Sequence, residues 1–206
     1  MNCNTVELIG IYGSDQTIAQ SAWTSTNREL TNEKISRIEK LINMLAKEGH
    51  HTPFEKSSLH FLCTVDVATQ IQILKHRIGV SVNSESERYK ELKDDKFYIP
   101  VDWTEEEKNK HVIFCEFCIK EYHETLNRLI SQGISRNRAK ESARFKLPYA
   151  SQYVLDIMFN FRSFIHFQKL RNDEHSQLEI RELAETMLSL VKEKHCFDIS
   201  LNAFGY

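Results

Sequence analysis

The sequence predicts a mixed α and β (α+β) fold in a single domain, residues 1–206, with a central, mostly antiparallel sheet flanked by long helices. Two kinds of pattern predict it: short apolar stretches with strand-like composition, and longer stretches with apolar residues at helical spacing. A chain of 206 residues, 41% hydrophobic and 27% charged, can bury a sizeable core. We find no internal repeat and no low-complexity linker that would divide it.

Three stretches are expected to be strands. Residues 4–12 are short and apolar and end at Gly13. In residues 59–65, Leu59, Phe61, Cys63 and Val65 occupy alternate positions, which predicts a strand with one buried face. Residues 149–159 are rich in aromatic and β-branched side chains, which favour strands.

Six stretches are expected to be helices. The first spans residues 33–48, with Thr31 or Asn32 as N-cap and Gly49 as the stop signal. Thr104 opens a capping box, so a long helix should run from there to about residue 131, stopped by Gly133. The other four are residues 67–74, a helix from about 135 that carries positions 141 and 144 and ends at Pro148, 160–170 and 174–194.

The bulk properties exclude several function classes. A formal net charge of −2 provides no general attraction to nucleic acid or to an anionic membrane. No run of 18 apolar residues and no leader-like N-terminus is present, so we expect a cytoplasmic protein. The five cysteines are irregularly spaced, and Cys115 and Cys118 fit a buried helical face better than a metal or redox site, so no metal is expected.

Residues 75–89 form the stretch with the most evident chemistry. Lys75, His76, Arg77 and Arg88 supply positive charge, and Ser81, Asn83 and Ser86 supply short hydrogen-bonding groups. This composition fits either a site for an anionic ligand or a solvated loop of mixed charge. Ser86 has no base placed beside it by the sequence, so we interpret it as a hydrogen-bond donor and not as a nucleophile.

Two further arginines are candidates for stabilising negative charge on a ligand. Arg144 could instead pair with Glu141 on the same helix face, and Arg171 could pair with Asp173 or Glu174. The residues by themselves leave both alternatives open.

Five elements, in order, resemble the motifs of flavin-dependent thymidylate synthases. They are His50-His51-Thr52-Pro53-Phe54-Glu55; the stretch from Lys75 to Tyr89; Glu141-x-x-Arg144-x-x-Leu147-Pro148; Asn160-x-Arg162-Ser163; and Leu170-Arg171-x-Asp173-x-His175-x-Gln177-x-Glu179-Ile180. Together they cover about residues 50 to 180.

The resemblance implies a reaction and a set of site residues. It implies methylation of dUMP to dTMP, with methylenetetrahydrofolate as one-carbon donor, NADPH as reductant and FAD as cofactor, in a homotetramer whose sites lie at subunit interfaces. Arg171 would assist ionisation of the uracil. The dUMP residues would be Gln72, Lys75, Ser84, Glu85, Ser86, Glu87, Arg88, Arg144 and Arg171. The FAD residues would be His50, Thr52, Lys75, His76, Arg77, Asn160, Phe161, Arg162 and His166.

Several positions depart from the family pattern. Lys75 replaces an arginine, Ser84 stands where a glutamate is usual, and an extra residue falls near Gly79-Val80; Trp23 and Ile71 also occupy positions where arginine is expected. The strand-linked glycine fingerprint of dinucleotide-binding folds is not found either. The alternatives are another one-carbon modification at pyrimidine C5, such as hydroxymethylation, or a non-catalytic protein that binds flavin or nucleotide.

Overall fold

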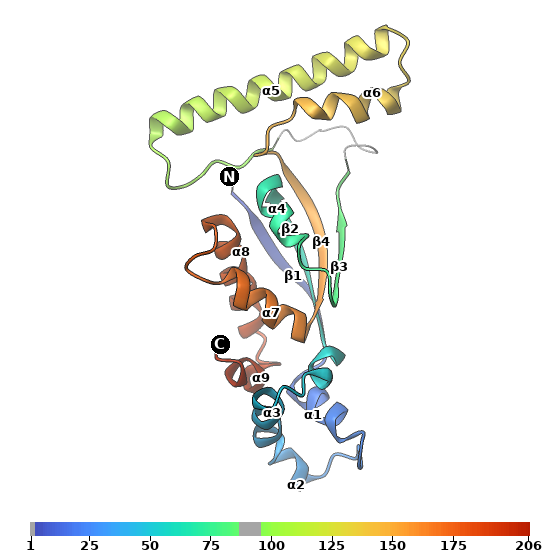
Figure 1. Cartoon of the computed structure of the whole chain (residues 1–206), viewed down its shortest axis with the longest axis vertical. Coiled ribbons are helices and arrows are strands. Elements are labelled where there is room, and N and C mark those ends of the chain that lie inside the picture. Colours follow the sequence, from blue (N-terminus) through green and yellow to red (C-terminus); the bar gives the residue numbers. More distant parts are fainter. Residues whose placement is uncertain (1–2, 87–95) are drawn as a thin grey trace. The chain divides into compact units, whose positions relative to one another are not determined.

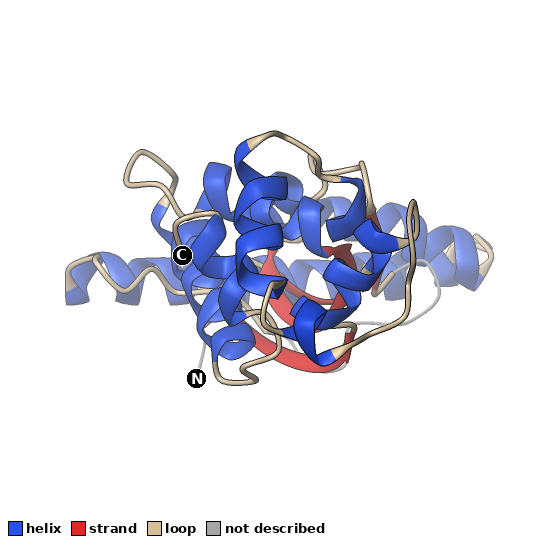
Figure 2. Cartoon of the chain, turned by 90° about the horizontal axis from the view of Figure 1, so that it is seen from below, coloured by secondary structure: helices blue, strands red, loops and turns tan. Residues whose placement is uncertain are grey.

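The computed structural model describes residues 3–86 and 96–206 (Figure 1). Helices and strands both contribute to it, as the sequence predicts (Figure 2). Four strands form an antiparallel sheet in the order β1-β2-β4-β3: β1 (Thr5–Tyr12), β2 (Ser58–Asp66), β3 (Val80–Ser84) and β4 (Gln152–Asn160). The mixed α and β class with an antiparallel sheet is therefore confirmed.

The chain divides into two compact units. Unit 1 comprises Met1–Thr5, Thr64–Gln72 and Asn83–Leu155, and unit 2 comprises Val6–Cys63, Ile73–Val82 and Asp156–Tyr206. The expectation of a single domain stays a prediction.

The strand β3 was not foreseen, whereas the other three strands were. Its pairing with β4 is antiparallel, because the Asn160 N–H donates to the Gly79 carbonyl and the Glu85 N–H donates to the Val154 carbonyl, both at 2.8 Å. Residue numbers therefore rise along one strand as they fall along the other, as antiparallel pairing requires.

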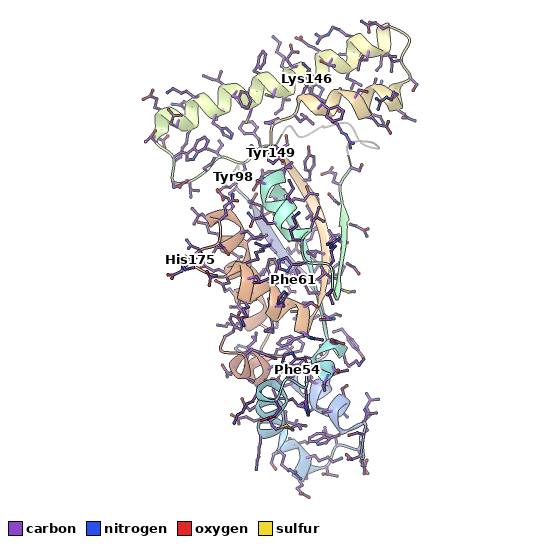
Figure 3. All side chains as sticks on the ribbon, in the orientation of Figure 1. Phe54, Phe61, Tyr98, Lys146, Tyr149 and His175 are labelled. Atoms are coloured by element: carbon purple, nitrogen blue, oxygen red, sulfur yellow. The ribbon has the colours of Figure 1, made fainter. Side chains whose placement is uncertain are left out.

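Unit 2 holds most of the helices. They are α1 (Asp15–Trp23), α2 (Asn32–Ile35), α3 (Ile38–Lys47), the 3-10 helix η1 (Thr52–Lys56), α7 (Phe161–Arg171), α8 (Leu178–Lys192) and α9 (Asp198–Ala203). Its core is aromatic: Phe61 of β2 stacks on Phe164 of α7 at 5.8 Å, and Phe159 of β4 lies 5.2 Å from Phe167. These contacts hold α7 against the sheet. Phe61 is labelled in Figure 3.

Unit 1 is organised around one long helix. It holds α4 (Val67–Ile73, whose last residue belongs to unit 2), α5 (Glu105–Ser131), α6 (Arg136–Ala143) and the 3-10 helix η2 (Arg144–Lys146). The helices α5 and α6 lie side by side (Figure 1), with Tyr122 and Leu126 packed on Ala139 and Ala143. Cys115 is fully buried, and burial raises the pKa of its thiol to about 11, which confirms it as a core side chain.

Helix signals in the sequence were mostly confirmed. Thr31 and Thr104 cap α2 and α5 by accepting from the N–H groups of Lys34 and Glu107, each at 3.3 Å. Gly49 follows the end of α3 with φ of +72°. None of the described helices is long and apolar enough to cross a membrane.

Four helix predictions need correction. The expected helix at 33–48 is two helices, because the chain turns at Ser36 and Arg37, where the Arg37 N–H donates to the Lys34 carbonyl at 3.0 Å, before α3 begins. In α4 the buried residues are Thr69 and Ile73, whereas Ile71 and Leu74, whose helical spacing with Val67 predicted the helix at 67–74, are exposed. The helix from 135 ends at Ala143, which leaves Arg144 in η2, and α8 begins only at Leu178.

Candidate ligand-binding site

The segment 76–79 is fastened to the N-terminus of α7. Asn160 is the N-cap of this helix, and its side-chain oxygen accepts from the Ser163 N–H at 2.8 Å. The Ser163 hydroxyl in turn donates to the Ile78 carbonyl at 2.7 Å. Gly79 has φ of +64°, and a Cβ added there would lie 2.2 Å from Asn160 Nδ2 and 2.4 Å from Ser163 Oγ. Glycine is therefore required where the segment passes the helix.

The first cavity, called here the Arg171 cavity, lies along this segment and has a volume of about 470 Å³. Its described lining includes Lys75, Arg77 and Arg171 but no carboxylate. Such a wall favours an anionic ligand, because nothing in the described lining offsets its positive charge. The lining residues are Lys75, His76, Arg77, Ile78, Val80, Ser163, His166, Leu170 and Arg171.

A hydrogen bond joins two residues of this wall. The Arg171 Nε–H donates to His76 Nε2 at 3.0 Å. Burial lowers the pKa of His76 to about 4, with smaller contributions from Arg171 and from His166. His76 is therefore neutral at physiological pH, and the positive charge of this pair belongs to Arg171.

A second cavity, the Arg162 cavity, has a volume of about 500 Å³ and shares Ile78, Ser163 and His166 with the first. Arg162 and Lys169 bring positive charge, and Arg162 forms an ion pair with Glu55. Ile78, 88% exposed, offers an apolar surface to both cavities. The lining residues are His51, Glu55, Ile78, Arg162, Ser163, Ile165, His166, Lys169 and Phe204.

The nine predicted flavin residues all lie in unit 2. Lys75, His76, Arg77 and His166 line the Arg171 cavity, and Arg162 and His166 line the Arg162 cavity. Asn160 lines a third hollow of about 450 Å³ beside Gly79 and Ser81.

Three of the nine are not among the lining residues of these hollows. His50 and Thr52 are exposed residues, whereas the neighbouring His51 lines the Arg162 cavity. The Phe161 side chain is fully buried, with its ring 4.7 Å from that of Phe197. A ligand in the cavities could therefore reach residue 161 only through its backbone.

The predicted dUMP residues are divided between the units. Lys75 and Arg171 line the Arg171 cavity in unit 2, whereas Gln72, Ser84, Glu85, Ser86 and Arg144 belong to unit 1. Glu87 and Arg88 lie outside the described residues. In unit 1, the Ser84 hydroxyl accepts from Gln70 Nε2 at 3.0 Å, and Glu141 accepts from Arg138 Nη1 at 3.4 Å.

Two charged residues of the Arg162 cavity were missing from the predicted site. Arg162, His166 and Lys169 follow one another at helical spacing, so the pattern that places the first two on one face of α7 could also have identified Lys169. Glu55 stood in the motif, and its ion pair with Arg162 joins η1 to α7. Ile78 lines both cavities, but as an apolar residue it had no feature in the sequence that predicted a place in a site.

The chain is therefore a mixed α and β protein with a cationic cavity that favours an anionic ligand. The family model described as thymidylate synthase complementing protein matches residues 7–195. The chain belongs to this family.

Curated relatives are about a third identical to the chain over the aligned residues. One named flavin-dependent thymidylate synthase from Ehrlichia ruminantium (strain Gardel) is 32% identical over 205 residues, which cover 91% of this chain and 66% of that protein. Another of the same name from Kosmotoga olearia is 30% identical over 204 residues, covering 92% and 85%. The chain thus spans slightly less than two thirds of the Ehrlichia relative.

Solved structures of related proteins share the fold. Two are of the UMP/dUMP methylase PolB from Streptomyces cacaoi, bound with 5-Br UMP in one and 5-Br dUMP in the other. They match with TM-scores of 0.80 and 0.81 at 26% and 28% identity, and cover 99% and 98% of this chain and 94% of each of theirs.

Proposed function

We propose that this chain is a flavin-dependent thymidylate synthase that methylates dUMP to dTMP, with FAD as cofactor and with NADPH and methylenetetrahydrofolate as co-substrates. The observation that carries the proposal is the Arg171 cavity, whose cations come from two of the family-like motifs, Lys75 and Arg77 from one and Arg171 from another. Family membership and the names of the relatives support it.

The residues of unit 2 suit a flavin dinucleotide. Its pyrophosphate is anionic, and the two adjoining cavities offer Lys75, Arg77, Arg162 and Lys169. Its ring system is flat and largely apolar, and the exposed side chain of Ile78 offers a matching surface. Cavities of about 500 and 470 Å³ are in the usual size range of cofactor and substrate sites. A bound flavin would supply the hydride chemistry.

The chain's own residues would bind and polarise the nucleotide. Lys75, as a compact ammonium, would contact a phosphate group by charge and not through a planar fork. Arg171 would stabilise negative charge that develops on the uracil edge, a role in which fixed cations are most effective in a site from which water is excluded. We place Gln72, Ser84, Glu85, Ser86, Glu87, Arg88 and Arg144 with the same substrate on the strength of the motif resemblance.

We also propose a homotetramer. The face of α5 that carries Ile113, Phe114 and Phe117 supports this, because these three large apolar side chains are between 57% and 67% exposed in the single chain. Contiguous exposed apolar surface of this kind is typical of interaction sites.

The direct test is product analysis. The purified chain, loaded with FAD, is given NADPH, methylenetetrahydrofolate and either dUMP or UMP, and the nucleotide product is identified by mass spectrometry. We expect dTMP from dUMP. A hydroxymethylated product, or no product from a yellow protein, would support one of the two alternatives instead. UMP is included because the structural neighbours are named UMP/dUMP methylases.

The proposed role of Arg171 has its own test. Arg171→Ala should lower turnover by about 100- to 1000-fold, the usual loss for one electrostatic donor, while FAD stays bound. The matched control is Arg37→Ala, which removes an exposed arginine that pairs only at 3.5 Å with Glu33. Turnover in Arg171→Ala close to that of the control would remove Arg171 from this role.

A further inference from the structure

The hydrogen bond between Arg171 and His76 determines where the imidazole carries its proton. An arginine Nε always bears hydrogen, so the ring nitrogen 3.0 Å away must accept. His76 Nε2 is that acceptor, which leaves the ring proton on Nδ1. A protonated imidazole would direct a second N–H at the guanidinium and break the contact.

The surroundings of His76 hold the ring in this state. The residue is 9% exposed, and its ring packs edge-on against Phe167, with 5.0 Å between the ring centres. The ring centre of His166 lies 6.1 Å from that of His76. The charged groups that line the same cavity, Lys75, Arg77 and Arg171, are all cationic. Burial and these charges together oppose protonation, which agrees with the pKa of His76 near 4.

A neutral acceptor has one advantage over a carboxylate at this position. An aspartate or glutamate would also hold Arg171, but its negative charge would offset the positive charge that the cavity presents. A neutral imidazole holds the guanidinium without adding a negative charge beside it. Holding the side chain in place before the ligand arrives also lessens the loss of side-chain freedom on binding.

We propose that His76 is a positioning residue for Arg171: its Nε2 lone pair fixes the guanidinium at the cavity wall, ready for negative charge on a bound pyrimidine nucleotide. The catalytic part of this statement rests on the proposed function. The pairing itself, the tautomer and the neutral state of His76 do not, and they can be tested without any substrate.

The first experiment follows the His76 ring by NMR in the chain without ligands. We expect the Nδ1–H tautomer and no titration of this ring between pH 5 and 8. In Arg171→Met, which keeps an unbranched side chain without the donor, the pKa of His76 should rise and the tautomer preference should weaken. Titration of His76 near pH 6.5 in the parent chain, or an Nε2–H tautomer there, would overturn the proposal whatever reaction the chain catalyses.

The second experiment compares two replacements of His76. His76→Gln keeps a neutral hydrogen-bond acceptor. His76→Phe keeps an aromatic ring but has no acceptor. We expect the Phe variant to lose at least about tenfold in kcat through misplacement of Arg171, and the Gln variant to recover most of that loss. In an Arg171→Ala background, His76→Phe should cost nothing further. Equal kcat in the two variants, or an undiminished loss in the Arg171→Ala background, would reduce His76 to a core side chain.

Discussion

Among single residues, two of the departures from the family pattern, Trp23 and Ser84, have local partners in this chain. The Trp23 ring lies beneath the Lys34 ammonium, 5.2 Å from its centre, and the same ammonium donates to the carbonyls of Asn27 and Glu29. A cation–π contact thus orders the chain between α1 and α2, at the position where an arginine was expected. Ser84, in place of a glutamate, is bonded to Gln70.

Gly79 follows the residues 76–78 that line the Arg171 cavity and passes directly against Asn160 and Ser163 at the N-terminus of α7. Gly79→Ala adds backbone strain in the left-handed region, about 1–2 kcal/mol, and drives a methyl group into Asn160 and Ser163. Relief of that clash disturbs the N-cap of α7, worth about another 1 kcal/mol. We therefore expect a loss of about 2–3 kcal/mol in the free energy of unfolding, measured by urea denaturation.

A second glycine provides the control for this substitution. Gly49 also has a positive φ, +72°, but a Cβ there would meet nothing within 4 Å. Gly49→Ala should therefore cost only the strain, about 1–2 kcal/mol. If both variants lose the same stability, the contacts of Gly79 with α7 contribute nothing measurable.

Among the helices and strands, those that could be predicted have their capping and stop residues within one segment of the sequence. The capping box at Thr104 and the stop at Gly133 predicted both ends of α5 closely. The strand β3 was missed, although Val80 and Val82 alternate with Ser81 and Asn83, because its few residues sit in a stretch dominated by charged and polar side chains. The break between α2 and α3 is a turn at Ser36 and Arg37, where the Arg37 N–H donates to the Lys34 carbonyl at 3.0 Å, and apolar periodicity does not reveal it.

The short helix α9 depends on a residue far away in the sequence. The buried Asp15 carboxylate accepts from the N–H groups of Ile199 and Ser200 at 2.9 Å each and from the Ser200 hydroxyl. Burial raises the pKa of Asp15, and these hydrogen bonds favour its charged form. Asp15→Ala leaves three donors without this acceptor, two of them buried, so we expect a loss of about 2–3 kcal/mol and faster hydrogen exchange in α9.

Asp198 supplies the control for this anchor. Its carboxylate lies 3.0 Å from His195 in an exposed pair at the start of the same helix. Asp198→Ala should cost no more than about 1 kcal/mol, because exposed pairs contribute little. Unchanged exchange of the α9 amides in Asp15→Ala would show that this carboxylate does not hold the helix.

For the whole molecule, the sequence motifs named cations that line the Arg171 cavity, but not the contacts among them. Lys75, His76 and Arg77 lie far from Arg171 along the chain, yet all four line one cavity. The hydrogen bond between Arg171 and His76 could not be predicted, because the sequence suggested acidic partners for Arg171. Which of two ring nitrogens faces which donor is a property of packing, here of Phe167 and His166.

The proposed homotetramer can be tested at the apolar face of α5. If the apolar face of α5 packs against another copy, Phe117→Glu places a charge in that contact without disturbing the buried face at Cys115, Ile119 and Tyr122. Light scattering should then give a mass below four times 24.2 kDa. The control is Ile35→Glu, which also replaces an exposed apolar side chain by glutamate, but in α2, and should keep the tetramer. A parent chain that is monomeric and fully active would contradict the assembly itself. A tetramer that survives Phe117→Glu would place the interface on another surface.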